Sequence, residues 1–270
     1  MSITMLAPTG VLLASGGGEG FEPPGPQDFW QPLIGSGTWA FTRPMLLWII
    51  SVVALSWWFI ATTRKAAIVP GKGQFLTEMF YNTTRNGIAR DMIGSKEFLK
   101  YVPFLFSLFA ILLVNNLFGV IPPFQFPTIS RIGFPIALTA IVYVIYHYIG
   151  IKKHGLRGYF GSFVPSGLPA WIVPMVLVLE TFSFFVTRPL TLAMRIFGNM
   201  LAGHMLLLVF ITGGEYMLLH GGIGLKVISV PTFLLAFIMT VFEALIEVVQ
   251  AYIFTLLAAS YIATSLADEH

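Results

Sequence analysis

The chain has 270 residues, of which 56% are hydrophobic and only 10% are charged. A soluble globular domain carries about 25% charged residues, so this chain has too little polar surface to be one. It has no cysteine, which excludes disulfides and thiolate metal sites, and its net charge is only +3. We therefore predict an all-α integral membrane protein, and we expect no cofactor, no bound metal and no nucleic-acid partner.

The first 42 residues differ in composition from the rest of the chain. They are rich in Gly and Pro, and Arg43 is the first Lys or Arg. A secretory signal peptide begins with a basic region, so none is predicted here, and the first span would direct insertion. We expect residues 1–42 to form a tail of low order on the outer side, and residues 43–270 to form a single polytopic membrane domain.

Three segments in the first part of the chain have the length of a membrane helix, which is about 20 residues. They cover residues 45–63, 101–121 and 132–151, and the first contains three tryptophans that suit the membrane interface. Residues 75–93 mix apolar and charged side chains. That mixture indicates either a short helix on the inner membrane surface or a plain loop.

The last two apolar segments, residues 171–212 and 230–267, are too long to stand upright in a bilayer. Residues 232–267 contain no Gly and no Pro, so no turn interrupts them. A helix of that length would extend about 54 Å, against a hydrocarbon core of about 30 Å. Two upright hairpins would need a break that the sequence lacks. We predict two long, strongly inclined helices, joined by a Gly-rich turn over residues 212–224.

The placement of charge predicts the orientation. Seven Lys or Arg residues lie between Arg64 and Lys100, and three follow the third span, whereas the opposite side has only Arg43, Arg131 and Lys226. The positive-inside rule makes the basic loops cytoplasmic. We therefore expect the N-terminus outside, the C-terminus inside, and the cell (inner) membrane of a bacterium as the location.

Polar groups recur within the two long segments: Glu180, Arg188, Arg195, Asn199 and His204 in the first, and Glu243, Glu247 and Gln250 in the second. Arginine stays charged at accessible pH, and a charge at the bilayer centre costs at least ~2.5–3.5 kcal/mol. One interpretation is a structural ion pair, in which Arg195 neutralises Glu243 or Glu247. The other is an ion pathway, which intramembrane ionisable residues usually mark.

The period of the α-helix shows how the groups of such an ion pathway would be arranged. Arg188, Arg195 and Asn199 share one face, whereas His204 points to the opposite side about 13 Å further along the axis. On the last helix the two glutamates and Gln250 fall within a stripe about 60° wide. A fixed cation with titratable groups displaced from it predicts two half-pathways for protons, kept apart by the positive charge.

Three stretches carry a family resemblance: "RPLTLAMRIFGNMLAGH" (188–204), "VQAYIFTLL" (249–257) and "NNLFGVIP" (115–122). From about residue 40 to the C-terminus the chain resembles subunit a of the F-type, rotary ATP synthase. The first two motifs are highly specific when they occur together. The resemblance implies five membrane helices, the last two long and inclined, lying as a hairpin against a ring of small subunits.

The resemblance also implies roles for single residues. Arg195 matches the essential arginine that faces the proton-carrying carboxylate of the ring, and Asn199 and Gln250 match its polar neighbours. His204 and Glu243 match a pair that lines the half-channel open to the outer side, and Glu247 faces the same way one turn on.

The resemblance is less direct for the residues at the cytoplasmic end of the proton pathway. Glu180 resembles the acidic residue of the inner half-channel, although "ETFSFFVTRP" (180–189) is one residue longer than the family pattern. Arg188 either tunes that pathway or extends to the cytoplasmic interface. We expect His147 to be a packed or interfacial histidine, and we expect solvated surface positions for His154, His220, His270, Glu215 and Asp268.

These features predict a proton-translocating stator subunit. The implied partners are a ring of c subunits, peripheral-stalk b subunits, the remaining ATP synthase subunits and membrane lipid. The sequence has no phosphate-binding loop and no nucleophile–base pair, so we expect no ATPase activity from the chain alone. Two alternatives remain: a free-standing ion channel or secondary transporter, and a purely structural membrane subunit of a respiratory complex.

Overall fold

The computed structural model describes residues 25, 32–35, 41–64, 66–121, 128–129, 131–161, 169 and 171–267. Four helical stretches are long and apolar enough to cross a membrane: Arg43–Thr63, Gly133–Leu156, Val173–His220 and Ile223–Leu266. A shorter apolar helix, α4, covers Val102–Leu117. The all-α membrane fold is therefore confirmed, whereas the inclination of the last two helices to the membrane stays a prediction.

Most of the predicted N-terminal tail lies outside the described residues. Within it, β1 (Pro32–Ile34) pairs antiparallel with β2 (Phe41–Thr42). Helix α1 then begins at Arg43 and ends at Thr63, close to the predicted 45–63. The predicted domain boundary stays a prediction. Asp268 and His270 also lie beyond the described residues.

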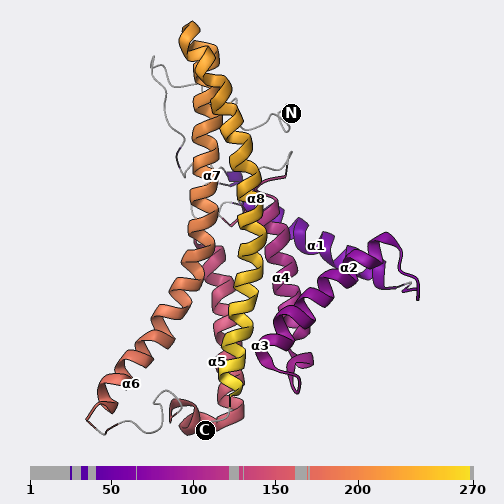
Figure 1. Cartoon of the computed structure of the whole chain (residues 1–270). Helices are drawn as coiled ribbons and strands as arrows, with labels where there is room; N and C mark the ends of the chain where they lie inside the picture. The colour runs from indigo at the N-terminus through magenta and orange to yellow at the C-terminus, as the bar shows by residue number, and fades with distance from the viewer. Residues whose placement is uncertain are drawn as a thin grey trace.

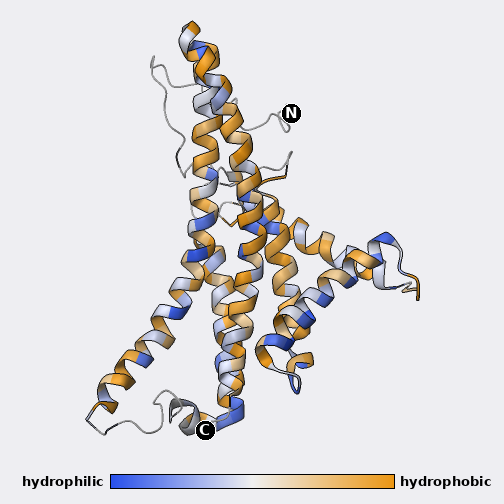
Figure 2. Cartoon of the chain, in the orientation of Figure 1, coloured by the Kyte–Doolittle hydropathy of each residue, from blue (hydrophilic) through white to orange (hydrophobic). Residues whose placement is uncertain are grey.

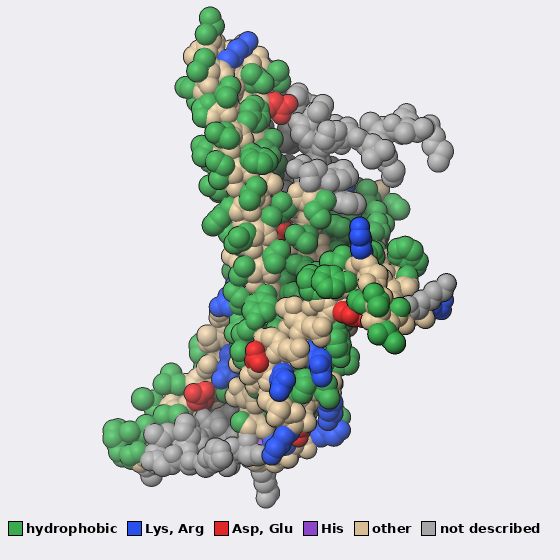
Figure 3. Space-filling view, turned by 45° about the vertical axis from the view of Figure 1, so that its right-hand side comes forward, with side chains coloured by type: hydrophobic (Ala, Val, Ile, Leu, Met, Phe, Trp, Pro, Cys, Tyr) green, Lys and Arg blue, Asp and Glu red, His purple; other side chains and the backbone are tan. Residues whose placement is uncertain are grey.

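The segment predicted as a surface helix or a loop is helical. It comprises α2 (Lys72–Asn82), the π-helix η2 (Thr83–Arg90), α3 (Asp91–Ile93) and, after a turn, the 3-10 helix η3 (Phe98–Lys100). The indole of Trp58 on α1 donates to the hydroxyl of Thr77 on α2 over 3.1 Å. Lys and Arg side chains gather over this part of the molecule, whereas the long upper part is mostly hydrophobic (Figure 3).

Helix α4 ends four residues before the predicted boundary at residue 121. Beyond Leu117 the chain tightens into turns, in which the amides of Gly119 and Val120 each donate to the carbonyl three residues earlier. Because the regular helical ladder stops here, the carbonyl of Gly119 is free to bond outside α4. That carbonyl is part of the site described below.

Helix α5 (Gly133–Gly161) is longer than the predicted 132–151, and it contains a reversal. Gly155 has φ 70°, a left-handed conformation that favours glycine, and the helix is kinked there. The last turns fold back so that the ring of Tyr159 covers Gly150, where a Cβ atom would collide with it. The phenol oxygen lies 2.5 Å from Nδ1 of His147.

The two long segments form one hairpin (Figures 1 and 2). Its first arm consists of α6 (Val173–Phe182), the π-helix η4 (Ser183–Thr187) and α7 (Arg188–His220), and its second arm is α8 (Ile223–Leu266). As predicted, no break interrupts residues 232–267. The core lies where α8 packs against α7, α4 and α5, with Ala251, Phe254, Ala258 and Ile262 all fully buried.

The hairpin turns within the predicted segment 212–224, but the turn is much shorter than predicted. Helix α7 continues to His220, and only Gly221 and Gly222 separate it from α8. Gly214 is buried, and a Cβ atom there would lie 3.2 Å from the ring of Phe233 on α8. The glycines before His220 therefore let two helices approach closely instead of turning the chain.

Candidate functional site

Three polar side chains meet inside the hairpin, between α7 and α8. His204 on α7 and Glu243 and Glu247 on α8 are each at most 5% exposed. Nδ1 of His204 lies 2.6 Å from Oε1 of Glu243. One ligand-type atom from each of the three residues lies within 4.8 Å of the others. The structure thus brings together the titratable residues that the sequence predicted for the outer half-pathway.

The backbone shapes this cluster from two sides. Gly203 admits the Glu243 side chain, since a Cβ atom at Gly203 would lie 2.7 Å from Oε1 of Glu243. From the turn after α4, the carbonyl of Gly119 lies 3.1 Å from Nε2 of His204. Nδ1 of the same ring lies 3.1 Å from the carbonyl of Met200. Both ring nitrogens of His204 therefore face oxygen atoms.

The carboxylates of Glu243 and Glu247 are buried with few protein partners. Apart from the contact between Oε1 of Glu243 and Nδ1 of His204, none of their oxygens has a hydrogen-bond partner among the described residues. The same holds for Oδ1 of the buried Asn116 on α4, whose amide donates to the backbone carbonyl of Glu247 over 3.0 Å. Buried polar groups are almost always satisfied, and ordered water is the usual partner where protein supplies none. This cluster is therefore suited to a chain of water.

The same cluster has the donor types of a metal site. Imidazole and carboxylate groups at this spacing are ligands that a divalent cation such as zinc accepts. The expectation that the chain binds no metal consequently stays a prediction.

Below the cluster, a second polar contact crosses the hairpin. The amide of Asn199 on α7 donates to Oε1 of Gln250 on α8 over 2.8 Å. The contacts of His204 with Glu243 and of Asn199 with Gln250 fix an antiparallel register between the two helices. One further level down, the guanidinium of Arg188 faces the ring of Tyr261 at 5.6 Å.

Arg195 lies on α7 between the level of Asn199 and the level of Arg188, outside the buried cluster. Its side chain is exposed, and it makes no ion pair or hydrogen bond with a described residue. The predicted structural pairing with Glu243 or Glu247 is therefore absent from the described part of the chain. The exposed guanidinium of Arg195 is therefore accessible to a partner protein.

At the start of α7, the guanidinium of Arg188 lies over an aromatic ring. Its guanidinium carbon is 3.6 Å from the centre of the Phe184 ring. A cation over a ring face is stabilised electrostatically. Glu180 is half-buried on α6, and the π-helix η4 separates it from Arg188. The predicted inner residues thus lie on the opposite side of Arg195 from His204.

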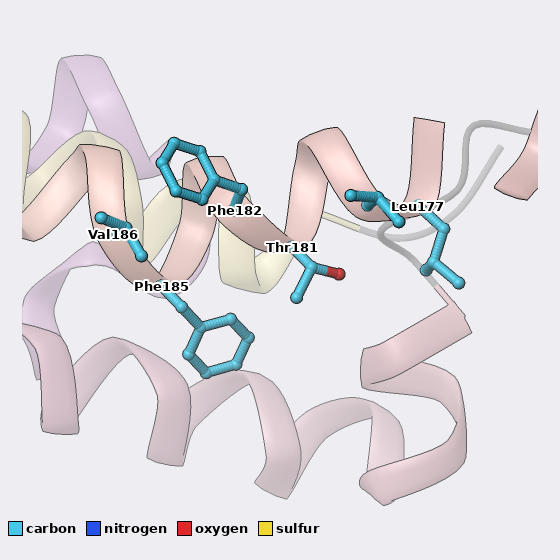
Figure 4. Close-up of a pocket in the computed structure, with 6 residues that line it drawn as sticks. Leu177, Thr181, Phe182, Phe185 and Val186 are labelled. Carbon is cyan, nitrogen blue, oxygen red and sulfur yellow. The ribbon is translucent and has the colours of Figure 1, made fainter. Parts of the chain in front are cut away.

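A shallow groove runs along α6 and η4 (Figure 4). It is lined by Leu177, Val178, Thr181, Phe182, Phe185 and Val186. With a single hydroxyl and no ionisable group, this groove offers nothing that carries a proton. Glu180 is not among the residues that line the groove, so its carboxylate lies on a different face of α6.

Comparisons with known proteins agree with the geometry. Residues 45–263 match the model of the family described as ATP synthase A chain. The chain belongs to this family. It is 46% identical to ATP synthase subunit a of Pseudarthrobacter chlorophenolicus, over 96% of this chain and 98% of that protein. It is 43% identical to the subunit a of a Nocardioides species, over 94% and 96%, and 38% identical to that of Streptomyces lividans, over 94% and 90%.

The structure adds three contacts to the candidate site that the sequence motifs did not assign to single residues. Asn116 comes from α4, the carbonyl of Gly119 from the turn that follows α4, and Gly203 from α7. The adjacent asparagines at 115 and 116 are polar groups within an apolar span, which is a signal that sequence alone contains. A backbone carbonyl and a close approach at glycine leave no such signal.

Proposed function

We propose that the chain is the proton-translocating stator subunit of an F-type ATP synthase. One observation carries the proposal: the order of groups along the hairpin. The buried cluster of His204, Glu243 and Glu247 lies on one side of Arg195, and Glu180 lies on the other. A fixed cation between two titratable regions is the arrangement that two separated half-channels require.

The proposed path has three steps. A proton from the outer side passes through the cluster of His204 and the two glutamates to a carboxylate on a neighbouring ring of c subunits. The ring turns, and the proton leaves inward on the Glu180 side of Arg195. The unpaired guanidinium favours the ionised form of a passing carboxylate, and it repels a hydronium ion that would cross directly between the half-channels.

The distribution of charge supports the proposed orientation. Under the positive-inside rule the basic surface over α2, η2 and α3 would face the cytoplasm, and the C-terminus would then lie inside and the N-terminus outside (Figure 3). Peripheral-stalk b subunits, the other ATP synthase subunits and lipid would complete the surroundings. The chain itself would carry no ATPase activity, because the catalytic chemistry belongs to other subunits.

The test of this proposal is the substitution Arg195→Ala in the assembled complex. We expect ATP-driven acidification of inverted vesicles to be abolished, and a passive proton leak to appear, while the subunit remains assembled. Arg195→Lys should also fail to couple, because a lysine can lose its proton when desolvated and lacks the planar fork of arginine. The matched change Arg188→Ala should be far milder.

Two results would contradict the proposal. A purely structural subunit would lose assembly with Arg195→Ala, and the amount of subunit recovered with the complex measures that directly. An assembled Arg195→Ala complex that still pumps normally would exclude the half-channel mechanism.

A further inference from the structure

The first arm of the hairpin changes its helical winding between Glu180 and Arg188. Residues Ser183–Thr187 form the π-helix η4, inside an otherwise continuous helical stretch from Val173 to His220. Pro189 follows two residues after Thr187, and a proline ring in a regular α-helix collides with the carbonyl four residues earlier, here that of Phe185. A wider π-turn relieves that collision. It also holds one residue more than an α-turn would.

The extra residue changes which face Glu180 occupies. In an uninterrupted α-helix, eight residues would leave Glu180 about 80° away from Arg188 around the axis. A π-turn absorbs one residue, which is about 100° of rotation, and reduces the difference to about 20°. Arg188 and Arg195, seven residues apart, also differ by about 20°. With the π-turn, all three residues therefore lie along one stripe.

One contact within the arm and one contact with α5 hold the π-helix in this rotation. Phe184 lies under the guanidinium of Arg188 at 3.6 Å. Phe185 stacks on His147 of α5, with ring centres 5.4 Å apart and an angle of 16° between the planes. His147 is itself held by Tyr159 from the reversed end of α5. Phe184 is thus fixed against the next turn of the same arm, and Phe185 is anchored to the separate helix α5.

We propose that the π-helix Ser183–Thr187 sets the rotational register of Glu180, aligning its carboxylate with Arg188 and Arg195 for proton release. This inference rests on the proposed function. The ring carboxylic acid gives its proton to water on the inner side, the Glu180 carboxylate accepts it, and inner water then removes it. Phe184 and Phe185 are positioning residues, because they act through Glu180.

The register is tested by changing the spacing. Inserting one Ala after Thr181 leaves Glu180 about 80° from the Arg188 face even with the π-turn present. We expect at least a tenfold lower rate of ATP-driven acidification in inverted vesicles. Deleting Ser183 in a Pro189→Ala background, where no proline requires the π-turn, instead leaves Glu180 and Arg188 seven positions apart, which a regular α-helix aligns, so pumping should stay within about twofold of the parent. This deletion preserves the Phe184–Arg188 spacing.

Two further variants serve as controls. The insertion combined with the deletion has the native spacing, and it should restore pumping. One Ala inserted between Ile172 and Val173 lengthens the same arm without changing the Glu180–Arg188 spacing, and it should pump normally. Assembly of each variant is measured by the amount of subunit that co-purifies with the complex.

A second readout does not depend on turnover. The chain has no cysteine, so Glu180→Cys places a single thiol on this face. Its reaction with a water-soluble thiol reagent from the inner side should slow at least tenfold when the Ala insertion is added. Unchanged labelling, or normal pumping by the insertion variant, would overturn the register proposal.

The parent substitution Glu180→Gln separates the two proposals. Slower proton release in Glu180→Gln, together with normal pumping by the insertion variant, would overturn the register and leave the proposed function intact. Normal pumping by Glu180→Gln would remove Glu180 from the proposed pathway and the register proposal with it.

Discussion

The imidazole of His204 has oxygen atoms against both nitrogens, with the carbonyl of Gly119 at Nε2 and the Glu243 carboxylate at Nδ1. A neutral imidazole can donate through only one nitrogen, and a carbonyl can only accept. The second contact therefore needs a further proton, carried by the ring or by the carboxyl of Glu243. The pair is built to hold an exchangeable proton, which is what a relay from outer water requires.

Much of this cluster could be predicted from residue spacing alone. The period of the α-helix places Glu243, Glu247 and Gln250 on one face, and the structure buries all three. The same period places His204 and Arg195 on opposite faces of their helix, and in the structure His204 is buried whereas Arg195 is exposed. The contact of the Gly119 carbonyl could not be predicted, because it joins two residues 85 positions apart through a backbone atom just beyond the end of α4.

Adding one methyl group at Gly203 should test whether the close packing of α7 on α8 matters for function. Gly203→Ala places a Cβ atom 2.7 Å from Oε1 of Glu243 and forces that carboxylate away from His204. We expect ATP-driven acidification to slow several-fold with assembly unchanged. Gly224→Ala, at the start of α8 with no atom within 4 Å, is the matched control. Equal rates for both variants would show that the contact between His204 and Glu243 does not limit proton uptake.

At the scale of elements, apolar length predicted which segments are helices, and the glycines at 213 and 214 misled about where the first long helix ends. Gly214 lies inside α7, where its lack of a side chain allows close packing on Phe233. Pro189 lies inside the first arm and is accommodated by a π-helix. The reversal at Gly155 depends on Tyr159 finding His147, a tertiary contact that local patterns do not contain.

That reversal gives a pH-dependent prediction. Burial, with a smaller contribution from Tyr143, raises the pKa of the Tyr159 phenol from 10.0 to about 12. The folded state thus favours the neutral phenol, so its contribution to stability is fully present below pH 10 and is lost as the pH rises toward 12. Tyr159→Phe also removes the hydrogen bond to His147, which costs about 1 kcal/mol at neutral pH.

Thermal unfolding in detergent at pH 8 and near pH 12 measures this effect. The unfolding temperature of the parent should exceed that of Tyr159→Phe at pH 8, and the difference should shrink near pH 12. Tyr148→Phe is the control, because that ring is 63% exposed on the same helix. A difference that stays constant over this pH range would contradict the assignment.

At the scale of the whole molecule, the hairpin has an apolar surface that the chain does not cover. Exposed hydrophobic side chains continue along both arms, among them Leu190 and Met194 on α7 and Val241, Leu245 and Val248 on α8. Arg195 lies on this surface as an exposed cation. A charge on a lipid-facing surface would be costly, so we expect a protein partner with a carboxylate at that level.

This surface leads to a prediction about the isolated chain. In liposomes, the subunit alone should conduct no protons, because its two half-pathways do not meet without a moving carboxylate carrier. Reconstitution with a ring of small carboxylate-bearing hairpin subunits should produce proton flux, and the matched ring with every carboxylate changed to its amide should not. Proton flux through the subunit alone, at a rate comparable to that of the reconstituted pair, would favour a free-standing channel and contradict the stator function.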